Sequence, residues 1–220
     1  MADMNIEKAR HNMVEQQIRP WDVLDQRVLD LVLRIPREEF VPAEYRSMAF
    51  VDMPLPIGHG EVMMEPKLEA RMVQSLAIQP GDKVLEVGTG SGYVTALLAG
   101  LAADVVSVEI EPELLEQARQ RLTTHGISNA VLEQGDAANG WDKAQPYDVI
   151  AVTGSVAALP RELKENMQVG GRMFVVVGES PIMEAMLVTR INANEWREEV
   201  LFETLLPPLK GASQEKPFVF

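Results

Sequence analysis

The sequence predicts an α/β protein built around a mostly parallel, doubly wound sheet. From Lys83 onward, short apolar runs alternate with helical segments, and a glycine-rich turn follows the first run. Continuous β-branched runs, without polar alternation, are typical of parallel strands that are covered on both faces. After Pro181, two longer alternating segments predict an antiparallel pair that closes the sheet.

The first third of the chain is expected to be helical and then irregular. Residues 5–35 carry apolar side chains near helical spacing, with an interruption around Pro20. Residues 36–66 contain five prolines, which break any regular period, so this stretch is expected to be irregular. Pro66 is expected to open a helix that continues to about Ile78.

The core elements are expected in a regular order. The predicted strands are 83–87, 104–108, 130–133, 147–152 and 172–177, followed by the antiparallel segments near 184–191 and 196–206. The predicted helices are 93–99, 112–125 and 160–168. Strands that alternate with helices in this way place helices on both faces of one sheet.

Composition excludes several classes of protein. The formal net charge of -13 argues against nucleic acid and against an anionic membrane surface as partners, because both attract clustered Lys and Arg. The chain has no cysteine, which excludes disulfides and thiolate metal sites. Its histidines and carboxylates show no metal-ligand spacing, so we expect no metal. The N-terminus has no apolar core of the signal-peptide type, so a cytoplasmic location is expected.

A glycine-rich loop is the strongest functional signal. Residues 86–92 read Glu-Val-Gly-Thr-Gly-Ser-Gly and lie between a predicted strand and a predicted helix. Glycines at such a turn let the backbone approach a ligand closely. Glu109 ends the second strand, where a ribose-binding carboxylate is expected in a doubly wound fold. A βαβ unit also tolerates isolated glycines, but three alternate glycines with a placed carboxylate favour a nucleotide-like ligand.

The spacing of the glycines narrows the choice of ligand class. It is G-x-G-x-G, which differs from the G-x-G-x-x-G of dinucleotide binders, and the chain has no Gly-Lys-Ser/Thr of a P-loop. Ser91 lacks the flanking residues of a nucleophile elbow. What remains matches the methyltransferase version of the fold, whose ligand is S-adenosylmethionine. Gly135-Asp136-Ala137, after the third strand, resembles the adenine-contacting turn of those enzymes.

Three longer segments resemble one family. PREEFVP at 36–42, DMPLPIGHG at 52–60 and VLEVGTGSGY at 84–93 are similar, in sequence and in order, to the protein-L-isoaspartate O-methyltransferases. This resemblance implies a Rossmann-like core with an N-terminal helical cap. It also implies methyl transfer from S-adenosylmethionine to the carboxylate of isoaspartyl residues in damaged proteins, as repair. We therefore expect residues 1–66 to form the cap and substrate loop, and 67–220 the methyltransferase core with its tail.

The resemblance also implies a set of donor-binding residues. They are expected to be Glu86, Gly88, Thr89, Gly90, Ser91, Gly92, Glu109, Ile110, Asp136, Ala137 and Thr153. The donor is a sulfonium cation, and S-adenosylhomocysteine is its product. The acceptor carboxylate is already ionised near pH 7, so the reaction needs no general base.

The substrate loop departs from the family. After the glycine turn the family usually reads Gln-Thr-Ile-Ser-Gln-Pro, whereas residues 61–66 here read Glu-Val-Met-Met-Glu-Pro. Met64 stands at the family's serine, and a thioether cannot donate a hydrogen bond. Glu61 replaces a neutral amide and would repel an acceptor carboxylate that it faced. His59 and Gly60 complete the predicted loop, with His59 more readily read as a backbone-bonded loop residue than as a base.

Several interpretations stay open at this point. Met63 and Met64 could fill the core or face the acceptor, and Ser155 could replace the missing hydroxyl or only cap a turn. Lys210 stands near the strand end where the family resemblance expects a polar donor-binding residue. The protein could instead methylate another acceptor, or bind the donor without catalysis. The apolar tail at 217–220 is expected to cover the cleft or to contact a second subunit, so a homodimer is possible.

Overall fold

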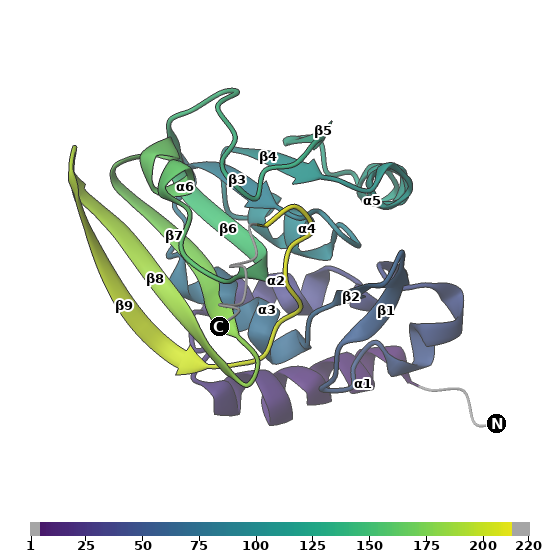
Figure 1. The fold of residues 1–220 in the computed structure, drawn as a ribbon. Helices are drawn as coiled ribbons and strands as arrows, with labels where there is room; N and C mark the ends of the chain where they lie inside the picture. Colours follow the sequence, from purple (N-terminus) through teal and green to yellow (C-terminus); the bar gives the residue numbers. More distant parts are fainter. Residues whose placement is uncertain (1–4, 213–220) are drawn as a thin grey trace, which may run out of the picture.

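The computed structural model describes residues 5–212, and the predicted role of the tail at 217–220 lies outside this range. A seven-stranded sheet has the order β5-β4-β3-β6-β7-β8-β9 (Figure 1). Its strands are β3 (Lys83–Val87), β4 (Asp104–Glu109), β5 (Ala130–Gln134), β6 (Tyr147–Val156), β7 (Met167–Glu179), β8 (Ile182–Asn192) and β9 (Glu195–Glu203). β5, β4, β3, β6 and β7 pair in parallel, whereas β8 and β9 are antiparallel additions. The predicted fold class is confirmed.

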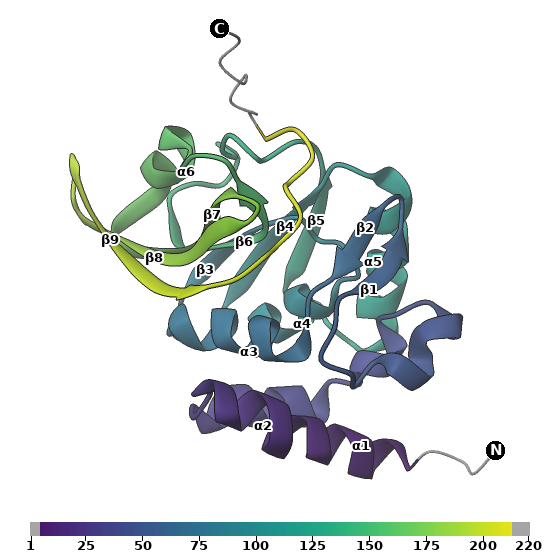
Figure 2. The same ribbon diagram turned by 60° about the horizontal axis from the view of Figure 1, so that its bottom comes forward.

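Helices cover both faces of the sheet. On one face, α3 (Pro66–Ser75) and α4 (Tyr93–Ala99) pack beneath the strands, and α1 (Ile6–Met13) and α2 (Gln26–Arg34) form an outer layer below them (Figure 2). α6 (Arg161–Asn166) lies on the opposite face, and α5 (Pro112–Thr124) follows β4. Shorter helical turns are Val14–Ile18, Arg19–Trp21, Arg37–Glu39 and Ala43–Met48. The predicted interruption near Pro20 is thus confirmed.

The two faces of the sheet bury alternate residues of the same strands. Val84 and Phe174 belong to the cluster that also contains the side chains of α1 to α4. Leu85 and Met173, each adjacent in sequence to one of these residues, belong to the second cluster on the other face. The continuous apolar runs arise because both faces are covered. Since side chains from both sides of residue 66 share the first cluster, the domain division at that residue stays a prediction.

One expectation for the N-terminal third is wrong. Residues 55–63 are not irregular but form a hairpin, in which β1 (Leu55–Gly58) pairs with β2 (Glu61–Met63). The turn residues Gly58, His59 and Gly60 have φ angles of 104°, 56° and 81°, which glycine adopts without strain and other residues rarely do. Pro56 is tolerated because this sheet has only two strands, so both are edges.

No helix within residues 5–212 is both long and apolar enough to cross a bilayer.

Candidate functional site

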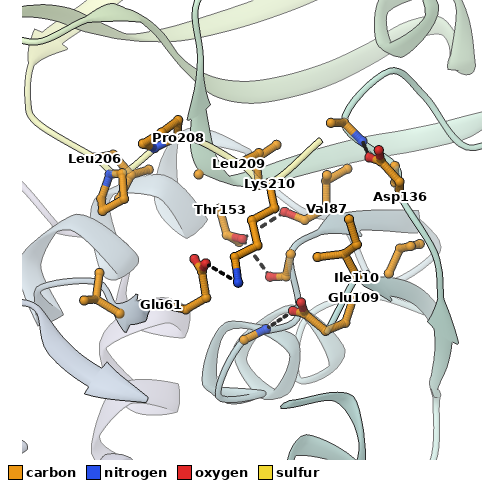
Figure 3. Close-up of a pocket in the computed structure, with 18 of the residues that line it drawn as sticks. Glu61, Val87, Glu109, Ile110, Asp136, Thr153, Leu206, Pro208, Leu209 and Lys210 are labelled. Atoms are coloured by element: carbon orange, nitrogen blue, oxygen red, sulfur yellow. Dashed lines mark hydrogen bonds and ion pairs between the residues drawn. The ribbon is translucent and has the colours of Figure 1, made fainter. Parts of the chain in front are cut away.

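The main cleft opens at the carboxyl ends of β3, β4 and β6. β3 has β4 on one side and β6 on the other, so the strand order reverses at this point, where doubly wound sheets bind their ligands. The hairpin closes one side of the cleft, and the strap, which we define as residues 206–210, closes another (Figure 3). The lining comprises Ile57, Glu61, Val62, Val87, Gly88, Gly90, Val108, Glu109, Ile110, residues 135–138, Thr153, Gly154 and the strap.

A smaller side chamber adjoins the main cleft. It is lined by Val62, Met63, Met64, Glu69, Gly88, Thr89, Gly90, Ser91, Val94 and Thr153. Four of these residues, Val62, Gly88, Gly90 and Thr153, also line the main cleft, so the two spaces meet at the glycine loop.

The glycine loop is shaped by hydrogen bonds from both sides. The amide of Gly90 donates to Glu109 Oε2 at 2.8 Å, and the Thr153 hydroxyl contacts the carbonyls of Val87 and Gly88 at 2.8 and 2.6 Å. Gly88 has a φ of +95°, and a Cβ there would lie 2.4 Å from Thr153 Oγ1. A side chain at position 88 is therefore excluded by backbone conformation and by space.

Glu86 lies beneath this loop and lines neither the main cleft nor the side chamber. Its Oε2 accepts hydrogen bonds of 2.5 Å from Thr95 and Ser107, whereas its Oε1 is buried without a partner. Burial raises the pKa of Glu86 to about 8. Burial therefore favours the protonated carboxyl at neutral pH.

This raised pKa predicts a pH-dependent stability. In the unfolded chain the pKa of Glu86 is near its usual value of 4.5. The contribution of Glu86 to stability is therefore fully present below pH 4.5 and is lost as pH rises towards 8. Glu86→Gln keeps the neutral shape and should lose less stability between pH 6 and 9. The expected advantage over wild type at pH 9 is on the order of a few kcal/mol, measured by urea unfolding. Parallel pH profiles for the two proteins would contradict this.

The other predicted donor residues are brought together only in part. The main cleft contains Gly88, Gly90, Glu109, Ile110, Asp136, Ala137 and Thr153, and the side chamber adds Thr89 and Ser91. Gly92 starts α4 against Ala118 and faces neither space. Asp136 accepts a hydrogen bond of 3.0 Å from the amide of Ala138, which fixes its carboxylate at the cleft wall. Most of the predicted donor residues therefore line one of the two spaces, although much of the lining was not predicted, and the roles assigned to these residues stay predictions.

An ion network ties the hairpin to the strap. Lys210 Nζ lies 2.6 Å from Glu111 Oε1 and 3.1 Å from Glu61 Oε1, and it donates to the carbonyl of His59 at 2.9 Å. The ring of His59 is 2.9 Å from Glu113 Oε2. Hydrogen bonding to Lys210 lowers the pKa of Glu111, and the same contact raises that of Lys210. Glu61 is therefore not an isolated negative charge, because an ammonium group compensates it.

The two loop methionines fit both sequence interpretations. Met63 and Met64 are each 4% exposed and belong to the core, and both also line the side chamber. Ser155 lies elsewhere: its amide and carbonyl bond the backbone of Pro207 and Leu209. Its side chain is buried and lines a separate cavity of about 700 Å³ on the other side of the strap. The structure therefore does not bring the Ser155 hydroxyl to the side chamber.

A buried arginine supports the substrate loop from behind. Arg37 is fully buried and donates to Glu69, to the carbonyl of Met64 at 2.6 Å and to that of Ala49 at 2.8 Å. Its guanidinium also lies over the ring of Tyr93, 5.2 Å from the centroid. Arg37 stood in a recognised motif, but no local pattern indicated that it holds the loop.

Comparison with known proteins identifies the family. The family model described as "Protein-L-isoaspartate(D-aspartate) O-methyltransferase (PCMT)" matches residues 8–214. The chain belongs to the protein-L-isoaspartate O-methyltransferase family. A family member from Marinobacter nauticus, protein-L-isoaspartate O-methyltransferase 2, is 38% identical over 203 residues, which cover 92% of this chain and 93% of that protein. One from Dictyoglomus thermophilum is 40% identical over 93% of this chain and 92% of its own length.

Solved structures of the family share the fold. A protein-L-isoaspartate O-methyltransferase with 27% identity superposes with a TM-score of 0.78 over 91% of this chain and 65% of its own. A Plasmodium falciparum protein, described as a putative member in complex with S-adenosyl-L-homocysteine, also gives a TM-score of 0.78. It is 19% identical and covers 94% of this chain and 99% of its own, so it supports the fold alone.

Proposed function

We propose that this protein transfers a methyl group from S-adenosylmethionine to a carboxylate, with isoaspartyl residues of proteins or peptides as acceptors. The observation that carries the proposal is the cleft at the strand-order reversal, where the glycine loop, Glu109 and Asp136 face one space. Membership of the family supports the acceptor class. Repair of damaged proteins follows as the biological role, and a cytoplasmic location and a homodimer stay predictions.

The residues of the cleft fit a sulfonium nucleoside. Glu109 uses one lone pair of each oxygen on the amides of Gly90 and Glu111, at 2.8 and 3.0 Å, which leaves acceptor capacity for ribose hydroxyls. Asp136 would lie at the adenine, and the bare backbone at Gly88 would accept the methionine portion. Carboxyls outnumber ammonium groups in this lining, which favours a cationic ligand.

The proposed reaction depends mainly on the alignment of the donor with the acceptor. The ionised acceptor oxygen would form a bond to the donor's methyl carbon while the S–CH3 bond breaks, without losing a proton. The electron pair of that bond would stay on sulfur, so neutral S-adenosylhomocysteine would leave. Val62, Met63 and Met64 give the side chamber an apolar wall that would exclude water. Holding donor carbon and acceptor oxygen in near-attack geometry then supplies most of the rate.

The test is methyl transfer to a peptide that contains one isoaspartyl residue, compared with the same peptide containing aspartate. Transfer of radiolabelled methyl to the first peptide alone would support the proposal. S-adenosylhomocysteine binding without transfer to either peptide would contradict the isoaspartyl acceptor and would favour the non-catalytic alternative.

A second candidate is methyl transfer to a different acceptor. It is favoured by the side chamber, where Val62 and Met64 stand at positions that carry hydroxyls in the family resemblance. Donor binding with transfer to another nucleophile, and none to isoaspartate, would establish this second candidate.

A hydroxyl restored at position 64 distinguishes the isoaspartyl acceptor from the second candidate. Met64→Ser should raise kcat/KM for the isoaspartyl peptide about tenfold, because a hydrogen bond to a charged group stabilises by roughly 1.5–3 kcal/mol. Met72→Ser is the matched control, since Met72 is buried but lines neither space. Both variants lose core volume, so unfolding curves must confirm that they are folded. An unchanged or lower kcat/KM in folded Met64→Ser would show that the methionine is not what limits isoaspartate transfer.

A further inference from the structure

The main cleft contains an unusual balance of charge. Among the described residues that line it, Lys210 carries the only ammonium or guanidinium group, beside the carboxyls of Glu61, Glu109 and Asp136. The described lining of the side chamber contains Glu69 and no Lys or Arg. This distribution suits a sulfonium cation, but it leaves a single charged group that can receive an anion.

The proposed reaction brings two carboxylates to this space. One belongs to the amino-acid portion of the donor, and the other is the methyl acceptor. Two of the three lining hydroxyls are engaged: the Thr89 hydroxyl pairs with Ser107 Oγ at 2.6 Å, and the Thr153 hydroxyl is engaged by backbone carbonyls. The third, that of Ser91, accepts from the amide of Tyr93 and is a neutral donor of the side chamber. A carboxylate that enters without a cationic partner would meet mainly like charges, which is unfavourable.

Lys210 is positioned to exchange partners. Its side chain reaches from the strap across the cleft towards Glu61 (Figure 3). The ammonium has three protons and three oxygen neighbours: Glu111 at 2.6 Å, the His59 carbonyl at 2.9 Å and Glu61 at 3.1 Å. Glu61 is the most distant of the three, and its side chain is 28% exposed. A ligand carboxylate can therefore replace Glu61 while the other two contacts hold the ammonium in place.

We propose that Lys210 is the carboxylate-binding residue of this cleft, and that Glu61 occupies its ammonium group until a ligand carboxylate displaces it. The inference rests on the proposed function and assigns the charge recognition within that site. The carboxylate comes from the donor or from the acceptor, and the two sources are separable by experiment.

The test compares wild type with Lys210→Met, and uses Lys164→Met as the control. Lys164 also pairs with a glutamate, Glu198 at 3.2 Å, but does not line the cleft. Calorimetry measures binding of S-adenosylhomocysteine and of 5′-methylthioadenosine, which lacks the amino-acid carboxylate. Steady-state kinetics measure KM and kcat for the isoaspartyl peptide.

Lys210→Met should weaken the binding of one carboxylate-bearing ligand about tenfold or more, because the variant loses a charge-assisted hydrogen bond to that carboxylate. Weaker binding of S-adenosylhomocysteine with unchanged binding of 5′-methylthioadenosine would show that Lys210 binds the donor carboxylate. A raised peptide KM with unchanged kcat and unchanged S-adenosylhomocysteine binding identifies the acceptor. In either case Glu61→Gln should lower the constant that Lys210→Met raises, which is the Kd of S-adenosylhomocysteine or the KM of the peptide. Lys210→Arg should recover part of the affinity that Lys210→Met loses.

Equal weakening of both nucleosides would mean that Lys210 only latches the strap, and would overturn the inference. Unchanged affinities and an unchanged peptide KM would also overturn it. A wild-type protein that binds no S-adenosylhomocysteine would contradict the proposed function and the inference together. If the inference alone fails, wild type still binds S-adenosylhomocysteine and methylates the isoaspartyl peptide, so the two failures are distinguishable.

Discussion

Replacing Arg37 with methionine is expected to lower the free energy of unfolding by about 3–5 kcal/mol. The substitution leaves the carboxylate of Glu69 buried without its partner, and it removes the donors to the carbonyls of Met64 and Ala49. Buried charges and carbonyls that lose their partners destabilise a fold far more than a broken surface pair does. Urea unfolding monitored by circular dichroism measures the loss.

Two further variants define the cause. Arg37→Met combined with Glu69→Met removes both charges, and should recover most of the loss. Arg161→Met breaks an exposed pair with Glu165, in which the arginine side chain is 82% exposed, and should leave the free energy of unfolding nearly unchanged. If the double variant were no more stable than Arg37→Met, the orphaned carboxylate would not be the source of the loss.

Gly88→Ala is expected to weaken S-adenosylhomocysteine binding about tenfold or more. A left-handed backbone costs a non-glycine residue roughly 1–2 kcal/mol, and the new methyl group would also lie 2.4 Å from Thr153 Oγ1. Relief of this strain and clash would move the loop backbone that is proposed to approach the ligand. Isothermal calorimetry measures the affinity directly.

Gly81→Ala is the matched control, because a Cβ at that position meets no heavy atom within 4 Å and the residue has no positive φ. It should bind the ligand as wild type does. Where Gly88→Ala proves too unstable, the added change Thr153→Ala removes the clashing hydroxyl, while the strained backbone and the methyl group at position 88 remain. Affinity within threefold of wild type in either folded variant would exclude a close approach of the ligand at Gly88.

The sheet was predictable because its signals are local. Most of the parallel strands contain a short apolar run with β-branched residues, and the glycine loop, Glu109 and Asp136 lie at successive strand ends in the expected order. The hairpin at 55–63 was missed because each strand has only three or four residues and one contains a proline. Such a stretch has too few positions to show a period.

The polar contacts that hold the site together were not predictable in the same way. Arg37 meets Glu69 across 32 positions of sequence, and Lys210 contacts the carbonyl of His59 across 151. Arg37 stood in a recognised motif and Lys210 at an expected donor-binding position, but nothing in a neighbouring window indicates a distant partner for either. Ser155 was a candidate for the missing hydroxyl, but its backbone bonds the strap and the residue does not line the side chamber.

The strap also determines whether the wall of the main cleft is complete. Residues 206–210 come after every strand of the sheet, and they close against a hairpin made near the other end of the chain. A chain that ended after β9 would contain every strand of the sheet, but its ligand cavity would lack one wall. Ligand-induced stabilisation, which requires the binding-competent state, is therefore expected only for chains that include the strap.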